Sequence, residues 1–291
     1  MKREVFIMEV KTVNLYEHYN IPANGATGGF LTVYSRAQSK EVKAKSRPAV
    51  LVIPGGGYGF VSEREGEPVA LAFVGKGYCA FVLDYTVNAA YPVPLIEACM
   101  AICYIRENAE SYGIDTTKVA AIGFSAGGHL TGMLATMYGE REVRQALGKR
   151  AQFVRPDAAV FSYPVVTTED GYTHENTRRV ISADGTLPYE KLSIEKRVTA
   201  DSVPAFIWHT MEDDCVPVEN SFFLASAYRK AGVPFALHIF EKGGHGLSLC
   251  NGEVCDNEEA VSRLGRVDKW IELAFDWLEL RGFKVRVKDM I

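Results

Sequence analysis

The stretch GFSAGGHL, residues 123–130, follows the apolar run KVAAI of residues 118–122 and precedes a segment that can continue as a helix. It places one serine, Ser125, between Gly123 and Gly127. Glycine costs conformational entropy in regular structure, so its repeated use here indicates a backbone that larger residues cannot adopt. A G-x-S-x-G pattern between a strand and a helix is typical of a sharp turn that lifts a serine hydroxyl clear of a sheet. The stretch therefore predicts a strand–turn–helix unit whose serine is either a nucleophile or part of a merely structural turn.

Other apolar runs along the chain indicate the fold class. They are rich in β-branched and aromatic residues and are separated by segments with helical periodicity: AVLVIP (49–54), CAFVLDY (79–85), DAAVFSY (157–163), PAFIWHT (204–210) and FALHIFE (235–241). Near-continuous apolarity is typical of a strand that is buried on both faces. Strands that alternate with helices predict an α/β fold, with a mostly parallel central sheet flanked by helices. The segments TVNLYEHY (12–19) and GFLTVYS (29–35) are predicted as antiparallel strands at one edge.

The domain organisation follows from the absence of a dividing linker. No internal repeat and no Ser-, Pro- or Gly-rich linker is evident, so we expect a single domain over residues 1–291. Residues 165–202 are more polar and follow the strand pattern poorly, which predicts a small cap-like insertion over the C-terminal edge of the sheet. The segment RVDKWIELAFDWLELRGF (266–283) predicts a closing amphipathic helix with Trp270, Leu273, Trp277 and Leu280 facing inward.

Composition excludes several classes of partner. The net charge of −4 argues against a nucleic-acid partner, because such partners require a basic surface. No apolar run approaches the ~20 residues that cross a bilayer, and no secretory signal is evident, so we expect a cytoplasmic protein without a membrane partner. We expect its six cysteines to be reduced thiols, although Cys250 and Cys255 could pair. Neither a metal nor a cofactor is predicted, and a homo-oligomer is compatible with the sequence.

Two polar loops follow later strands and could complete a catalytic site with Ser125. The stretch HTMEDDCVPVENS (209–221) follows one predicted strand, and EKGGHGLSL (241–249) follows the next. A serine hydroxyl is a weak nucleophile, and it needs a positioned base that a carboxylate orients. The order serine, aspartate, histidine is that of α/β-hydrolases, and each candidate lies past the carboxyl end of a strand, where α/β sheets assemble their sites. The sequence therefore predicts that Ser125, an aspartate and His245 converge.

A glycine triplet after the first buried strand predicts an oxyanion hole. In IPGGGYGF (53–60), the glycines leave backbone N–H groups unobstructed by side chains. The amides of Gly56 and Gly57, together with that of Ala126, could hold the oxyanion of a tetrahedral intermediate. Tyr58 and Glu65 follow this loop and are candidates for lining the substrate entrance, or else ordinary loop residues.

The set VIPGGGY, GFSAGGHL, HTMEDDCVPV and GGHGL resembles the esterase and lipase branch of the α/β-hydrolases. More narrowly, it resembles bacterial acetylesterase-like proteins related to acetyl-xylan and feruloyl esterases, over nearly the whole chain. The resemblance implies Ser125 as nucleophile, His245 as general base and acid, and an aspartate as the group that orients the imidazole. The related pattern D-x-x-V-P maps onto Asp213, with Asp214 as the alternative and Glu212 as a third candidate. His129, one helical turn after Ser125, is expected to be structural.

The resemblance also implies a reaction. We expect a serine carboxylesterase that hydrolyses short-chain acetyl esters through an acyl-enzyme, with a small-molecule ester, an acetylated sugar or xylo-oligosaccharide, as substrate. One alternative is peptide or amide hydrolysis, because the EDD…VP stretch also resembles prolyl-oligopeptidase-type peptidases. Another is a non-catalytic ligand-binding relative, because a fold does not guarantee an activity.

Overall fold

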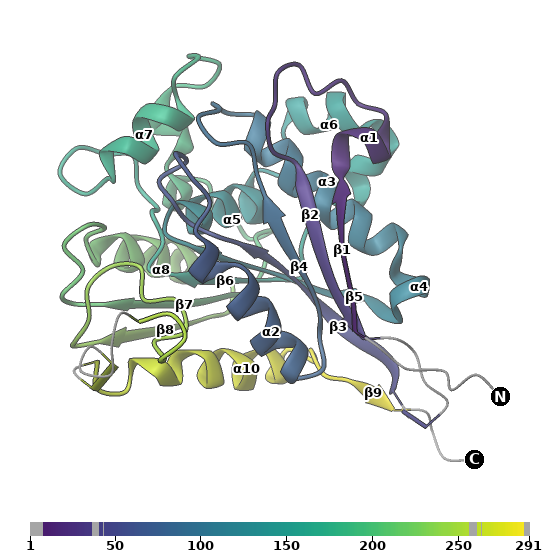
Figure 1. The fold of residues 1–291 in the computed structure, drawn as a ribbon. Coiled ribbons are helices and arrows are strands. Elements are labelled where there is room, and N and C mark those ends of the chain that lie inside the picture. Colours follow the sequence, from purple (N-terminus) through teal and green to yellow (C-terminus); the bar gives the residue numbers. More distant parts are fainter. Residues whose placement is uncertain (1–7, 37–40, 43, 256–260, 263, 288–291) are drawn as a thin grey trace.

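The computed structural model describes residues 8–36, 41–42, 44–255, 261–262 and 264–287, and these form a nine-stranded sheet (Figure 1). The strand order is β1-β2-β4-β3-β5-β6-β7-β8, with β9 beside β3. Strands β3 to β8 are parallel, whereas β2 pairs antiparallel with β1 and β4. The bounds are β1 Met8–Asn14, β2 Phe30–Arg36, β3 Ala44–Ile53, β4 Cys79–Asp84, β5 Ile114–Phe124, β6 Ala158–Ser162, β7 Ala205–Thr210, β8 Phe235–Phe240 and β9 Arg286–Val287. The predicted α/β fold with its mostly parallel sheet is confirmed.

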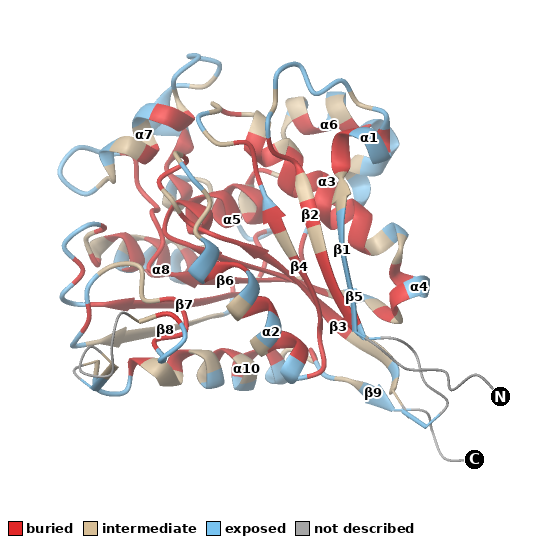
Figure 2. Ribbon diagram, in the orientation of Figure 1, coloured by how far each residue is buried: buried red, intermediate tan, exposed pale blue. Residues whose placement is uncertain are grey.

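The central strands bury both faces, as their continuous apolarity predicts. Along β3, Leu51 and Ile53 belong to one hydrophobic cluster, while Val50 and Val52 belong to a second cluster on the opposite face. Figure 2 shows the central strands as buried along most of their length. Each fully buried Leu, Ile or Val side chain stabilises the fold by about 1.5–3 kcal/mol. This two-sided core holds the carboxyl ends of the strands in fixed positions.

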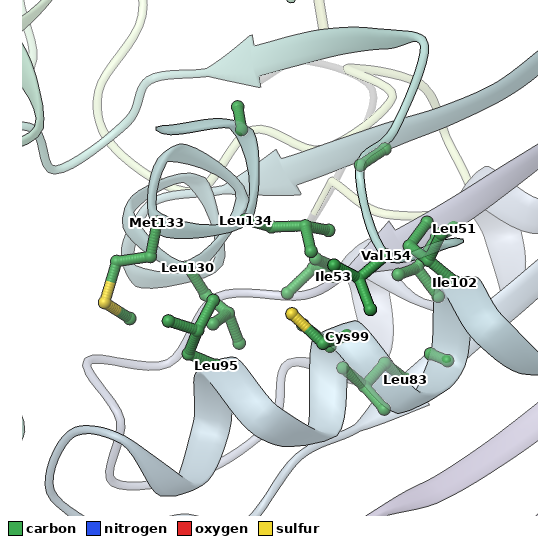
Figure 3. Packing of buried hydrophobic residues seen from close by; sticks show 14 of the residues in the cluster. Leu51, Ile53, Leu83, Leu95, Cys99, Ile102, Leu130, Met133, Leu134 and Val154 are labelled. Atoms are coloured by element: carbon green, nitrogen blue, oxygen red, sulfur yellow. The ribbon is translucent and has the colours of Figure 1, made fainter. Parts of the chain in front are cut away.

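Two layers of helices cover the sheet. Helices α2 and α10 contribute to one cluster, and α1, α3, α4, α5, α6, α7 and α8 contribute to the other. Figure 3 shows Leu51 and Ile53 of the sheet gathered with Cys99 and Leu134 of the helices. In the described ranges no helix is both long and apolar enough to cross a membrane. The helices are α1 Leu15–Tyr19, α2 Glu67–Gly75, α3 Val93–Glu107, α4 Ala109–Tyr112, α5 Ala126–Thr136, α6 Arg141–Leu147, α7 Glu175–Ile181, α8 Glu219–Ala231 and α10 Trp270–Leu280, with 3₁₀ turns at Glu63–Glu65, Gly148–Phe153, Tyr189–Leu192, Ile194–Lys196 and Val267–Lys269.

Two local predictions are wrong in part. The strand predicted over residues 12–19 ends at Asn14, because the Asn14 side chain accepts hydrogen bonds from the amides of Tyr16 and Glu17 and starts helix α1. Leu280 does not face inward but is 84% exposed at the last position of α10. At the end of a helix the apolar stripe can run past the surface that it covers, which explains this difference.

The segment 165–202 connects β6 to β7 and contains α7 and two 3₁₀ turns. It is anchored at its base, because Leu192 and Ile194 are buried and the Ile194 amide donates to the carbonyl of Val166. Figure 1 shows α7 beyond the edge of the sheet, and its Val180 and Ile181 belong to the same hydrophobic cluster as residues of α3 and α5.

Candidate active site

Ser125 occupies a strained turn between β5 and α5. Its φ of +52° and ψ of −119° lie outside the regions that residues other than glycine normally adopt. A Cβ at Gly123 would lie 2.1 Å from the carbonyl oxygen of Gly127, and a Cβ at Gly127 would lie 2.1 Å from that of Ile53. The two glycines therefore allow the helix to approach both strands closely while the serine stands at the apex of the turn.

We expect the substitution Gly127→Ala to destabilise the fold. Its Cβ would meet the backbone oxygens of Ile53 and Pro54 at 2.1 and 2.3 Å, and these atoms cannot move without shifting β3. The free energy of unfolding should fall by about 2–3 kcal/mol, measured by chemical denaturation. Gly75→Ala at the end of α2 is the matched control, because no atom lies within 4 Å of its added Cβ. Equal unfolding midpoints for the two variants would contradict the close-approach argument.

Three side chains from separate loops meet at the carboxyl edge of the sheet. His245 Nε2 lies 2.7 Å from Ser125 Oγ, and His245 Nδ1 lies 2.7 Å from Asp213 Oδ2. An ionised carboxylate only accepts hydrogen bonds, so Nδ1 carries the proton and Nε2 accepts from the serine hydroxyl. This chain of hydrogen bonds can transfer the serine proton to the imidazole.

Asp213 is held as an anion by its surroundings. Its Oδ1 accepts from the amides of Cys215 and Val216 at 3.0 and 2.9 Å, and its Oδ2 accepts from His209 Nε2 at 3.1 Å as well as from His245. Burial alone would raise the pKa of Asp213, but the hydrogen bonds from His209 and His245 outweigh it and hold that pKa well below its usual range. Asp213 can therefore stabilise a positive charge on its neighbouring imidazole.

The two other acidic candidates lie elsewhere. Glu212 accepts from Lys242 Nζ at 2.8 Å and from the amide of Gly243 at 3.0 Å. Asp214 is exposed, and among the described residues no hydrogen bond joins it to His245. The geometry thus brings Asp213, and neither neighbour, to the imidazole.

Ser125 lines a cavity of about 410 Å³. The other lining residues include Gly56, Gly57, Phe60, Arg64, Glu65, His174, Asn176, Cys215 and His245. Gly56 and Gly57 have φ values of +127° and +61°, which favour glycine. Within the described part of the chain, their amides and that of Ala126 donate no hydrogen bond. Two N–H groups of the cavity wall, and a third on the residue after Ser125, therefore have no acceptor among the described residues.

Tyr58 does not line this cavity, contrary to one of the two predicted alternatives. Its side chain is fully buried, and its hydroxyl lies 3.0 Å from His129 Nδ1. The positive φ of Tyr58 turns the ring into the core, where it packs against Tyr85. His129 is wholly buried, and its Nε2 also contacts the carbonyl of Leu192, so its surroundings are those of a structural residue.

Glu65 lines the cavity, but its carboxylate links two loops. Oε2 accepts from the amide of Gly55 at 2.7 Å, and Oε1 accepts from the hydroxyl of Tyr163 at 2.6 Å. That hydroxyl accepts in turn from the amide of Ser248, three residues after His245. Burial raises the pKa of Glu65, against the effect of these hydrogen bonds. Glu65 thereby ties the glycine loop to the histidine loop.

Among the cavity residues that were not predicted, two come from the segment 165–202. His174 and Asn176 come from the start of α7, and Asn176 Nδ2 donates to the carbonyl of Gly57 at 2.8 Å. Both belong to the segment 165–202, which was predicted as an insertion. The site residues were predicted from their positions at the carboxyl ends of strands, and this segment has no predicted strand. Their only signal in the sequence is their polarity within that segment.

This chain is similar to known proteins in sequence and in structure. The sequence model of the BD-FAE family matches residues 33–228. Endo-1,4-beta-xylanase B of Butyrivibrio fibrisolvens is 40% identical over 78% of this chain and 36% of that protein. Acetylxylan esterase of Xylanibacter ruminicola is 27% identical over 69% of this chain and 41% of that protein. This chain thus spans well under half the length of these two relatives.

A solved structure matches over almost its whole length. The crystal structure of an acetyl ester-xyloside bifunctional hydrolase from Caldicellulosiruptor lactoaceticus has a TM-score of 0.78 and 34% sequence identity. The match covers 94% of this chain and 97% of that one. Its strands and helices therefore correspond to those described above.

Proposed function

This chain belongs to the BD-FAE family of carboxylic ester hydrolases with the α/β-hydrolase fold, and from this premise we propose that it is a serine carboxylesterase. Ser125 is the nucleophile, His245 the general base and acid, and Asp213 the group that orients the imidazole. One observation carries the proposal: these three side chains form a hydrogen-bonded chain, and its serine lines a cavity together with Gly56 and Gly57, whose amides have no acceptor among the described residues.

The first half of the proposed reaction forms an acyl-enzyme. Ser125 Oγ attacks the ester carbonyl carbon while its proton passes to His245 Nε2, and Asp213 stabilises the imidazolium. The amides of Gly56, Gly57 and Ala126 stabilise the oxyanion. Removal of one such donor typically costs about 3–4 kcal/mol of transition-state stabilisation. The carbon–oxygen bond to the alcohol then breaks, and the imidazolium protonates the departing oxygen.

The second half releases the acid. Water attacks the acyl carbon as His245 Nε2 takes one of its protons, and the same amides hold the second oxyanion. Collapse of this intermediate breaks the bond to Ser125 Oγ, which regains the proton. The products are the free acid and the starting enzyme.

We propose acetyl esters of sugars or xylo-oligosaccharides as the substrate class. Support comes from the names of the similar proteins, which include an acetylxylan esterase, a xylanase and an acetyl ester-xyloside hydrolase. The segment 165–202 acts as a small cap, because it contributes His174 and Asn176 to the cavity.

An ester panel tests the proposal. If acetyl esters are the substrate class, we expect p-nitrophenyl acetate to be hydrolysed with a kcat/KM at least about ten-fold above that of p-nitrophenyl octanoate. Acetate should be released from acetylated xylo-oligosaccharides. Faster hydrolysis of an aminoacyl p-nitroanilide would favour a peptidase instead. Absence of both turnover and fluorophosphonate labelling at Ser125 would favour a non-catalytic relative.

A further inference from the structure

His174 lines the cavity but takes no part in the proposed reaction. It directly precedes α7, and its Nδ1 accepts a hydrogen bond from the amide of Thr177 at 3.3 Å. The hydroxyl of Thr177 lies 2.9 Å from the same nitrogen. Because a backbone amide can only donate, Nδ1 carries no proton, and the neutral ring must carry its proton on Nε2.

The ring is kept neutral, and its Nε2–H group has no hydrogen-bond acceptor among the described residues. Partial burial lowers the pKa of His174, and the nearby His245 lowers that pKa further. In the described ranges Nε2 has no hydrogen-bond partner, although the ring lines the cavity together with Ser125 and His245. The cavity therefore has, besides the amides of Gly56 and Gly57, a side-chain donor on His174 whose ring is held in place by its contacts with Thr177.

The chemistry of an acetyl ester limits what this donor can reach. The acetyl group has one polar atom besides the ester oxygen, its carbonyl oxygen, and the proposed oxyanion hole already takes that atom. A further donor that contacts substrate therefore has its acceptor in the alcohol part. The ring lies against the glycine loop, since a Cβ at Gly57 would be 3.1 Å from His174 Cε1. An acceptor there is close to the ester group.

We propose that His174 Nε2–H donates a hydrogen bond to an oxygen of the alcohol part next to the ester, such as a neighbouring sugar hydroxyl. His174 thereby selects acetates of polyhydroxylated alcohols over acetates of simple alcohols. This inference rests on the proposed esterase function and adds a specificity-determining residue to it.

Two substitutions separate the donor from the helix cap. His174→Asn retains an acceptor at the δ position that can cap α7, and it removes the donor at the ε position. His174→Gln retains an N–H donor near the ε position. The substrates are an acetylated methyl xyloside with free neighbouring hydroxyls and p-nitrophenyl acetate, whose alcohol has no hydroxyl. The measured quantity is the kcat/KM for the xyloside divided by the kcat/KM for p-nitrophenyl acetate. The unfolding temperature of each variant is measured in parallel.

We expect His174→Asn to lower that ratio about ten-fold, mainly through a higher KM for the xyloside, and His174→Gln to restore most of it. His18→Asn, exposed on α1 and outside the cavity, should keep the wild-type ratio. An unchanged ratio in His174→Asn, including equal losses on both substrates, would overturn the inference. A wild-type enzyme that hydrolyses p-nitrophenyl acetate but not the xyloside would also overturn it while leaving the esterase proposal intact. A wild-type enzyme inactive on both esters would overturn both proposals.

Discussion

Replacement of Ser125 by alanine is expected to lower kcat for p-nitrophenyl acetate by about five to six orders of magnitude. The variant has no hydroxyl to form the acyl-enzyme, and His245 Nε2, 2.7 Å from that hydroxyl, has no serine proton to accept. A small residual rate should remain, because the amides of Gly56, Gly57 and Ala126 can still polarise a bound ester. Initial rates at saturating ester give kcat, and labelling with a fluorophosphonate probe should disappear in parallel.

The control for this experiment is another serine replaced in the same way. Ser111 is exposed on α4, where its hydroxyl donates to the carbonyl of Asn108. Ser111→Ala should retain wild-type turnover and labelling. Both variants should unfold at similar denaturant concentrations, since alanine at position 125 meets the same φ of +52° as serine. Near-normal turnover by Ser125→Ala would show that another group attacks the ester.

The fold could be predicted because its strands are buried on two faces. The run AVLVIP at 49–54 predicts such a strand, and its residues 49–53 form the carboxyl-terminal half of β3. The N-terminal edge was harder to predict. Whether residues 15–19 continue β1 or form α1 depends on one side chain, that of Asn14, whose oxygen caps the helix. Periodicity over a few residues does not distinguish these outcomes. In α1, the apolar residues Leu15, Tyr16 and Tyr19 are buried.

The residues of the site that directly follow strands could be predicted from the topology of the sheet. Ser125, Asp213 and His245 each stand just after a strand of one parallel sheet, and parallel strands end at the same edge. His174 and Asn176 lie in a connection whose path depends on tertiary packing, so their position relative to Gly57 could not be derived from spacing.

The direction in which the side chains of Glu65 and Tyr58 point could not be predicted from the sequence either. Glu65 was a candidate for the substrate entrance, and its side chain does reach the cavity. Its principal contacts are nevertheless with Gly55 and Tyr163, which lie in two different loops. Tyr58, seven residues earlier, points into the core instead. Side chains in an irregular connection can face opposite ways, and the backbone dihedral angles, such as the positive φ of Tyr58, decide which way each one points.

The second large effect is expected from Asp213→Asn, which should lower kcat for acetyl esters by about four orders of magnitude. The asparagine oxygen can still accept from the amides of Cys215 and Val216, so the loop is retained. Its NH₂ group, however, would donate to His245 Nδ1 where the carboxylate oxygen now accepts at 2.7 Å. The imidazole would then carry its proton on Nε2, and in that form it cannot take the proton of Ser125.

The matched control lies at the next position, because Asp214→Asn makes the same chemical change on an exposed side chain of the same loop. It should leave kcat within about two-fold of the wild-type value, in the range of surface changes that alter no contact of the site. Rates are measured over a range of pH values, and the unfolding of both variants is followed so that a damaged loop is recognised. Loss of the buried carboxylate removes the charge that stabilises the imidazolium, so the deficit of Asp213→Asn should persist at every pH at which the protein stays folded. If Asp214→Asn were the variant with the large loss, the orienting carboxylate would be Asp214, and the loop would have to rearrange during the reaction.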